Sequence, residues 1–178
     1  MDGILEKFLK RQLEEGLDLA ANSDIVDLFP LDGPPPQHYV AEFHCKGLIR
    51  TEDGRIRQWN HFAVGIHFPN DYLRSVDPFA VLRWLSPPSR EHPNTYVYHP
   101  NISDKAPIIC VGKIPPGMSL TDLLHQLYEI ISFQNYCPNE YDSLNAACCS
   151  WARSNASLFP LECRALRRRT LNLEVEQI

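Results

Sequence analysis

Leucines near the start of the chain recur at every fourth position: Leu5, Leu9, Leu13 and Leu17. With 3.6 residues to a turn, this spacing places them on one side of an α-helix whose opposite side is charged. We therefore predict an amphipathic helix over residues 4–21. A second apolar stretch, residues 25–31, leads into Gly33-Pro34-Pro35-Pro36, which indicates a stiff extended connector.

The middle of the chain alternates between apolar and polar positions. Apolar residues occupy every second position over residues 39–45 and again over 62–68, where Gln58 and Asn60 start the same alternating face. A period of two gives a strand one apolar face. Thr51-Glu52-Asp53-Gly54 provides a turn between the two runs, because Gly54 is free to adopt a positive φ. The pattern predicts a hairpin with one apolar side.

Two shorter strands are predicted beyond this hairpin, over residues 79–85 and 95–98, with Pro87-Pro88 between them. Together the strands give a four-stranded antiparallel meander. The segment from His99 to Gly117 then contains four prolines and two glycines, which leave little room for regular structure. Irregular loops of this length inside a compact domain are usually functional.

Helical periodicity returns after this loop. Ser119 followed by Asp122 predicts a capped helix start. The helix that follows has a broad apolar stripe, made of Leu120, Leu123, Leu124, Leu127, Ile130 and Ile131. Pro138-Asn139 marks a turn, and a final helix is predicted over residues 143–158. Strands in one run followed by helices in another favour an α+β fold with one sheet face covered.

Composition narrows the function classes. The chain has 178 residues and a net charge of -5, so it fits one domain and lacks the cationic surface of a nucleic-acid binder. We interpret its one basic cluster, Arg164 with Arg167–Arg169, as a solvated tail. The charged N-terminus and the lack of a long apolar run predict neither a signal peptide nor a membrane span, which makes the cytoplasm the expected location.

The six cysteines favour reduced thiols over a disulfide framework, because no secretory signal is recognised. No Cys-x-x-Cys pair occurs, so we expect no structural zinc site, and no cofactor is indicated. A cysteine taken alone is usually a small buried apolar group. Cys148 and Cys149, on the predicted final helix, fit that interpretation.

One ordered set of motifs stands out. Tyr98-His99-Pro100-Asn101-Ile102 precedes Cys110, which stands nine residues after Asn101. Phe68-Pro69-Asn70-Asp71-Tyr72 lies upstream, and Pro138-Asn139 through Asp142-Ser143-Leu144 lies downstream. This combination resembles the ubiquitin-conjugating enzymes. A second triplet, His92-Pro93-Asn94, lacks the flanking residues and lies sixteen residues before Cys110, so we interpret it as a loop.

The resemblance implies the ubiquitin-conjugating-enzyme fold, with an N-terminal helix, a four-stranded meander, a long active-site loop and two C-terminal helices. It implies that Cys110 accepts a ubiquitin-like protein as a thioester from an activating enzyme and passes it to an amine of a protein target, with or without a ligase. Asn101 would stabilise the oxyanion or brace the loop, and Asp142 would orient the amine and help to deprotonate it. His99 and Pro100 would shape the loop.

Several positions depart from the family pattern. Residues 73–78 replace its usual proline-rich run, and residues 111–118 replace the Leu-Asp and Trp that commonly follow the cysteine. Such departures resemble bacterial relatives found in antiviral defence operons. We predict an N-terminal helical segment and connector over residues 1–37, a conjugating-enzyme-like core over 38–160 and a tail over 161–178.

Other interpretations stay open. The chain could be a binding module on the same fold, without catalysis. A cysteine hydrolase would need a histidine base beside the thiol, for which His99 and His125 are the candidates. Cys137, near the same loop, is the second candidate nucleophile. Taken alone, Asn101 is most often a turn residue and Asp142 a helix cap.

Overall fold

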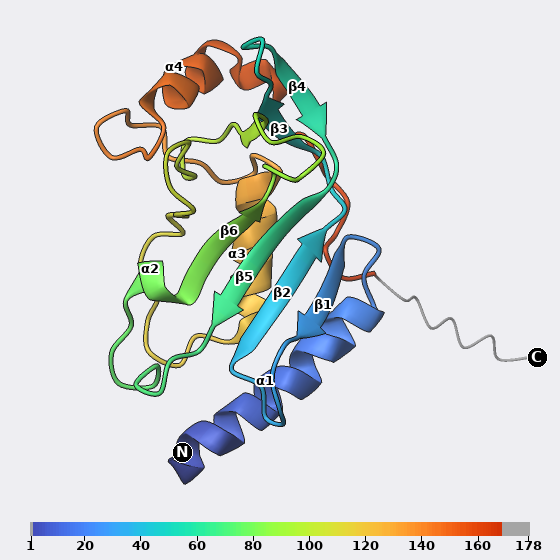
Figure 1. Ribbon diagram of the computed structural model, residues 1–178, viewed down its shortest axis with the longest axis vertical. Coiled ribbons are helices and arrows are strands. Elements are labelled where there is room, and N and C mark those ends of the chain that lie inside the picture. The colour runs from blue at the N-terminus through green and yellow to red at the C-terminus, as the bar shows by residue number, and fades with distance from the viewer. Residues whose placement is uncertain (1, 169–178) are drawn as a thin grey trace, which may run out of the picture.

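The computed structural model describes residues 2–168 and centres on a four-stranded antiparallel sheet (Figure 1). The strand order is β1-β2-β5-β6, with bounds β1 Val26–Pro30, β2 His38–Phe43, β5 Phe62–His67 and β6 Leu82–Ser86. Helix α3 (Leu120–Ile131) lies behind the sheet, and α1 (Gly3–Ala21) lies beside β1. This confirms the predicted α+β class and the N-terminal helix. Among residues 2–168, no helix is long and apolar enough to cross a membrane.

The core forms between the sheet and α3. Alternate residues of β2 and β5 point into it, as do the predicted leucines and isoleucines of α3. Helix α1 packs closely because Gly16 has no side chain, and a Cβ there would lie 2.7 Å from Leu120 and 2.8 Å from Leu28. The Gln12 side chain also accepts a hydrogen bond from the Leu120 backbone N–H at 2.7 Å. Thus α1 satisfies a free donor at the start of α3.

A second, three-stranded sheet was not predicted. It has the order β4-β3-β7, with β3 Gly47–Arg50, β4 Ile56–Trp59 and β7 Tyr96–Val97. The predicted strand over 95–98 therefore belongs to this sheet, and β1 is the fourth strand of the main one. Strand β3 escaped prediction because three successive residues, Gly47, Leu48 and Ile49, are all buried and do not alternate.

Two predicted elements are shorter than expected. The stretch over 79–85 begins as a short helix, α2 (Pro78–Val81), which Asp77 caps, and only then continues as β6. The final helix, α4, spans Ala146–Ser154 and is followed by a 3-10 turn at Ala156–Leu158. It begins late because the Asn145 side chain caps it by accepting the Cys148 N–H.

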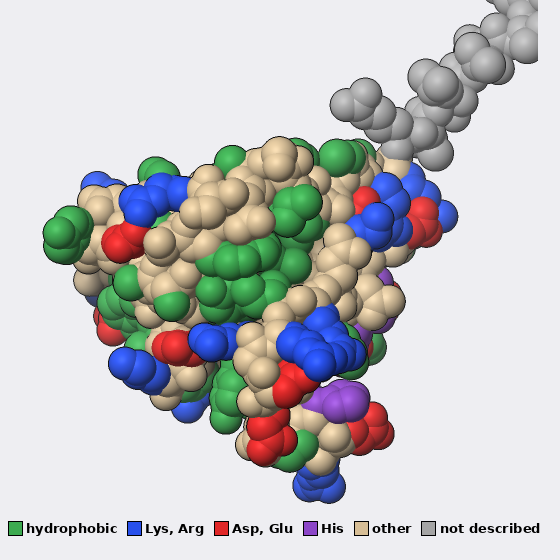
Figure 2. All heavy atoms as spheres, turned by 90° about the horizontal axis from the view of Figure 1, so that it is seen from above, with side chains coloured by type: hydrophobic (Ala, Val, Ile, Leu, Met, Phe, Trp, Pro, Cys, Tyr) green, Lys and Arg blue, Asp and Glu red, His purple; other side chains and the backbone are tan. Residues whose placement is uncertain are grey.

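A smaller core cluster holds α4 against β3 and β7, and consists of Leu48, Tyr98, Phe133, Cys148 and Ala152. Partly buried hydrophobic residues border it: Ile56, Tyr136, Trp151, Phe159 and Leu161. Figure 2 looks down on this end of the molecule and shows hydrophobic side chains gathered across its middle.

Residues 161–168 return to the body of the protein. Leu166 is buried, and the Arg168 N–H donates to the Asn22 carbonyl at 2.8 Å. The arginines that the structure describes are exposed, as the solvated interpretation expected, but they do not form a free tail, because each pairs with a carboxylate: Arg164 with Glu162, Arg167 with Asp18 and Arg168 with Asp24. Arg169 lies outside the described residues. The division of the chain at residues 37 and 160 stays a prediction.

Candidate active site

Residues 99–110 fold into a narrow, hairpin-like loop. Ile102 and Ile109 form an isolated antiparallel bridge and are both buried, which anchors the loop in the core. Beyond that bridge, the Cys110 backbone N–H donates to the Asn101 carbonyl at 2.8 Å. The nine-residue spacing in the sequence therefore becomes a direct contact, with Asn101 and Cys110 opposite each other at the base of the loop.

The Asn101 side chain links two parts of the site. Its Nδ2 donates to the Cys110 carbonyl at 2.9 Å, and its Oδ1 accepts the Cys137 backbone N–H at 2.7 Å. These two bonds favour the bracing role among the two that the family resemblance implied. A primary amide nitrogen has two hydrogens, so a further N–H besides the one bonded to Cys110 can serve as a donor.

His99 is buried directly beneath this pair. Its Nδ1 accepts the Asn101 backbone N–H at 3.0 Å, which places the proton of the neutral ring on Nε2. Within residues 2–168, Nε2 has no hydrogen-bonding partner, and the ring instead meets Phe133 at 4.3 Å between centroids. Burial lowers the pKa of His99 to about 3. His99 is thus a neutral ring that shapes the loop.

Phe133 supports His99 and was missed by sequence reasoning. It follows α3 with a φ of 58°, in the left-handed region that favours glycine. Its N–H bonds to the Ile130 carbonyl at 2.9 Å and the Gln134 N–H to the Glu129 carbonyl at 2.8 Å, the two bonds of a Schellman motif. Its ring stacks on Phe159 at 4.4 Å. The turn directs this ring toward His99, and no pattern around Phe133 signals it.

Three of the six cysteines are buried. Burial raises the pKa of Cys45 to about 12 and also raises the pKa of Cys148 and of Cys149. The interpretation of Cys148 and Cys149 as buried helix positions is confirmed. Cys110 and Cys137 are partly exposed, and Cys163 is exposed. The partly exposed Cys110 therefore lies where the Asn101 amide bonds to its main chain.

Asp142 lies in an exposed segment that crosses near the same loop. The segment is tied down because the Leu144 and Asn145 N–H groups donate to the Pro100 carbonyl, at 2.9 and 3.2 Å. Asp142 itself accepts a hydrogen bond from the Asn139 side chain at 2.6 Å. The alternative role of Asp142 as a helix cap is wrong, since Asn145 caps α4. Among the described residues, Asp142 has no hydrogen bond to Asn101 or Cys110.

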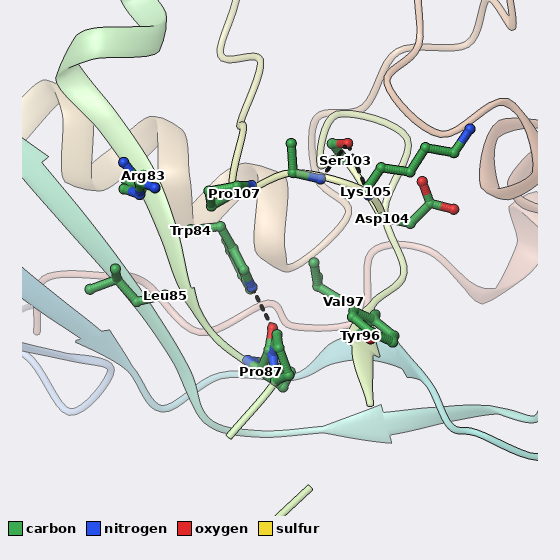
Figure 3. Close-up of a pocket in the computed structure, with 12 residues that line it drawn as sticks. Arg83, Trp84, Leu85, Pro87, Tyr96, Val97, Ser103, Asp104, Lys105 and Pro107 are labelled. Carbon is green, nitrogen blue, oxygen red and sulfur yellow. Dashed lines mark hydrogen bonds between the residues drawn. The ribbon is translucent and has the colours of Figure 1, made fainter. Parts of the chain in front are cut away.

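The far end of the hairpin-like loop, Ser103–Pro107, borders a pocket of about 380 Å³ (Figure 3). Strands β6 and β7, with Pro87 and Pro88 after β6, form its other walls. The Trp84 backbone N–H donates to the Pro107 carbonyl at 3.1 Å, and the indole N–H donates to the Pro87 carbonyl at 2.7 Å. The same loop thus contacts the edge of the main sheet at one end and holds Cys110 at the other.

No group of three or more His, Cys, Asp or Glu side chains suited to a metal ion is found within residues 2–168. The groups that this loop and its neighbouring segment hold are the Cys110 thiol, the Asn101 amide and the Asp142 carboxylate, whose segment is tied to the loop through the Pro100 carbonyl. These groups suit acyl transfer through a thiol.

Comparison with known proteins supports the fold. No family model and no curated protein sequence matches the chain. Its structure is similar to that of the H. polymorpha ubiquitin conjugating enzyme Pex4p, solved in complex with the soluble domain of Pex22p, with a TM-score of 0.54, 17% identity and coverage of 85% of this chain and 89% of that one. The E2 domain of a Toxoplasma gondii ubiquitin conjugating enzyme gives a TM-score of 0.50 and 20% identity, covering 85% of this chain and 90% of that domain. The chain has the ubiquitin-conjugating-enzyme fold, as its motifs predicted.

Proposed function

We propose that this protein is a ubiquitin-conjugating-type acyltransferase that carries a ubiquitin-like protein as a thioester on Cys110. The observation that carries the proposal is the Cys110 site itself. Cys110 is partly exposed at the base of the loop, and its backbone N–H and its carbonyl both bond to Asn101. This arrangement occurs within a fold shared with ubiquitin-conjugating enzymes.

The proposed reaction has two steps. The Cys110 thiolate attacks the thioester carbonyl that joins the ubiquitin-like protein to the activating enzyme; a new thioester forms and the activating enzyme's thiolate leaves. An amine of the protein target then attacks this thioester, an amide bond forms, and the Cys110 thiolate leaves. Asn101 keeps Cys110 in place and offers its second N–H to the oxyanion, while Asp142 takes the proton that the amine loses.

The proposed partners follow from this chemistry. They are an activating enzyme, a ubiquitin-like protein, a protein target and, for some targets, a ligase. We place the reaction in the cytosol, because a thiol carrier must stay reduced. The departures from the family motifs support a bacterial antiviral conjugation system as the setting. The Pex4p structure contains a partner protein, Pex22p, which supports a role for partner proteins here too.

A cysteine hydrolase would need a histidine base beside the Cys110 thiol, and neither candidate, His99 or His125, suits that role. The Nδ1 of His99 is occupied by the Asn101 N–H and its ring is buried, so it cannot accept a proton from Cys110. His125 is exposed on α3 and lines a different cavity, with Arg11 and Glu15 of α1. Neither histidine is placed as the thiol's base.

A charging assay tests the proposal. The protein is incubated with ATP, an activating enzyme and either ubiquitin or a ubiquitin-like protein encoded beside its gene, then run on a non-reducing gel. We expect an adduct that a thiol reductant removes, that is absent in Cys110→Ala and that becomes reductant-stable in Cys110→Ser. Cys163→Ala, which alters an exposed cysteine outside the site, should charge normally. Normal charging of Cys110→Ala would show that the nucleophile is misassigned, and a binding module would give no adduct.

A further inference from the structure

Cys137 has no part in the reaction above, yet its main chain lies close to that of Cys110. The Asn101 amide bonds to the Cys110 carbonyl at 2.9 Å and to the Cys137 N–H at 2.7 Å. The oxygen and nitrogen of one amide are about 2.2 Å apart, so these two main-chain atoms lie within about 8 Å of each other. Cα atoms joined by a disulfide are usually about 4.4–6.8 Å apart. The Asn101 side chain thus holds the two cysteine-bearing segments next to each other, and a disulfide requires a local shift that brings their Cα atoms into this range.

Both cysteines also lie in segments that can close the remaining gap. No helix or strand occurs between Cys110 and α3, or between α3 and α4. Cys137 is partly exposed, and its thiol donates only to the Asn139 carbonyl, at 3.3 Å. Neither thiol is enclosed by the core, so a local shift of either loop can bring the sulfur atoms together.

We propose that Cys110 and Cys137 form a dithiol site in which a hydroperoxide produces a reversible disulfide. The Cys110 thiolate attacks one peroxide oxygen and the O–O bond breaks, giving a sulfenic acid on Cys110 and hydroxide from hydrogen peroxide. The Cys137 sulfur then attacks the Cys110 sulfur, the S–O bond breaks, and the oxygen leaves as water with the proton from Cys137. Two electrons pass from the dithiol to the peroxide, and an external dithiol reverses the change.

The other cysteines are poorly placed for this step. Cys149 is the nearest alternative, since its thiol donates to the Cys137 carbonyl at 3.3 Å, but it is fully buried and burial raises its pKa. Cys163 is exposed but belongs to the C-terminal segment, where its N–H bonds to Glu162. Cys137 is therefore the resolving thiol, and Cys163 is the matched control.

The disulfide has a consequence for the site. It would remove the Cys110 nucleophile reversibly and protect it from further oxidation to sulfinic acid, which thiols cannot reverse. The loss of charging that follows rests on the proposed function, whereas the disulfide itself does not. The experiment therefore measures the covalent state of the thiols and needs no activating enzyme.

The test treats the full chain with hydrogen peroxide, blocks the remaining thiols with an alkylating reagent and determines the intact mass and the cross-linked peptides. We expect the wild type and Cys163→Ser to lose two hydrogens and to give a Cys110–Cys137 peptide that dithiothreitol cleaves. Cys137→Ser should instead gain oxygen on Cys110, first one atom and then two. Circular dichroism of each variant verifies that it is folded.

A two-hydrogen loss that persists in Cys137→Ser, a cross-link to Cys149 or Cys163, or oxygen gain on Cys110 in the wild type without a disulfide would each overturn the proposal. If the Cys110–Cys137 disulfide forms but the protein does not charge, the result counts against the proposed function alone. Normal charging without any disulfide would count against the dithiol alone.

Discussion

The chain contains the triplet His-Pro-Asn twice, and the two copies have opposite surroundings. His92, Pro93 and Asn94 are all exposed. The His92 N–H bonds back to the Ser89 carbonyl at 3.2 Å, and its ring meets the edge of Trp59 at 5.5 Å. The first triplet is an exposed surface turn whose hydrogen bonds stay local and whose histidine ring meets one partly buried ring of β4.

The second triplet lies seven residues later and is enclosed. His99 and Pro100 are buried, and each contacts groups from beyond α3: Phe133 meets the His99 ring, and the Leu144 N–H bonds to Pro100. Asn101 is bonded at both ends of its amide. The three residue types thus define a site only where later parts of the chain return to meet them. Variants matched between the two copies test this contrast.

The largest effect on stability is expected for Phe133, which contacts the second triplet through the His99 ring and has no ring contact with the first. Phe133→Ala should lower the free energy of unfolding by about 3–5 kcal/mol, because a buried aromatic ring is lost. Phe133→Gly should be more stable than Phe133→Ala by about 1 kcal/mol, because the φ of 58° suits glycine. Urea denaturation measures both.

The control for this order is Phe62 in β5, where backbone conformation is extended. There the glycine variant should be the less stable of the two, since glycine weakens a strand. If Phe133→Gly proves less stable than Phe133→Ala, the positive φ is not a source of strain.

The next effect concerns the asparagines of the two copies. Asn101→Ala leaves the Cys110 carbonyl and the Cys137 N–H without their partner, which should lower the free energy of unfolding by about 2–4 kcal/mol. Asn94→Ala removes an exposed side chain and should change stability by less than about 0.5 kcal/mol. Equal effects from the two alanine variants would remove the distinction between the copies.

A smaller effect separates the histidines by pH. Burial lowers the pKa of His99 to about 3 from an ordinary 6.5. Below pH 6.5, His99 therefore binds a proton in the unfolded chain but not in the folded chain. The free energy of unfolding falls as the pH drops. The slope due to this residue should approach about 1.4 kcal/mol per pH unit near pH 5.

Denaturation at pH 7, 6 and 5 measures that slope. His99→Gln should lower the slope of the free energy of unfolding against pH by the amount that corresponds to one bound proton. His92→Gln should leave that slope unchanged. Below about pH 4.5 a second contribution appears, because hydrogen bonding to Arg164 lowers the pKa of Glu162 to about 2 and its protonation then destabilises the fold. An unchanged slope in His99→Gln would show that the ring is not held neutral.

The smallest effect on stability is expected for Asp142, which borders the second triplet's loop. Asp142→Ala should change the free energy of unfolding by less than about 0.5 kcal/mol, since the side chain is exposed. It should leave charging intact but slow discharge to free lysine about tenfold or more at pH 7. The difference in discharge rate between Asp142→Ala and the wild type should become smaller at higher pH, where the lysine amine loses its proton without help from Asp142. Asp104→Ala, an exposed carboxylate at the loop's far end, is the control, and an equal slowing there would argue against proton transfer by Asp142.

The contrast between the copies also shows what the sequence could predict. Local signals predicted elements well. The leucine spacing predicted α1, although Leu17 is exposed, and Ser119 with Asp122 predicted the start of α3, where the Ser119 hydroxyl accepts the Asp122 N–H at 3.1 Å. The spacing of Asn101 and Cys110 also indicated their proximity. These features depend on residues near one another in the chain.

What failed depends on distant partners. Strand β3 has no alternation because both of its faces are covered, and β1 became recognisable as a strand only through its pairing with β2. The positive φ of Phe133 arises from the turn that ends α3, and the bond between Asn101 and Cys137 spans 36 positions. Periodicity contains no information about such contacts.

The Asn101 side chain offers a donor on one side and an acceptor on the other, and the site uses both. Spontaneous deamidation would replace that nitrogen by oxygen and turn the amide into a carboxylate with almost the same shape. The Cys110 carbonyl would then face a second acceptor and a negative charge. An aged sample could therefore keep its fold while losing the alignment of Cys110, so the working lifetime of this site rests on one side-chain nitrogen.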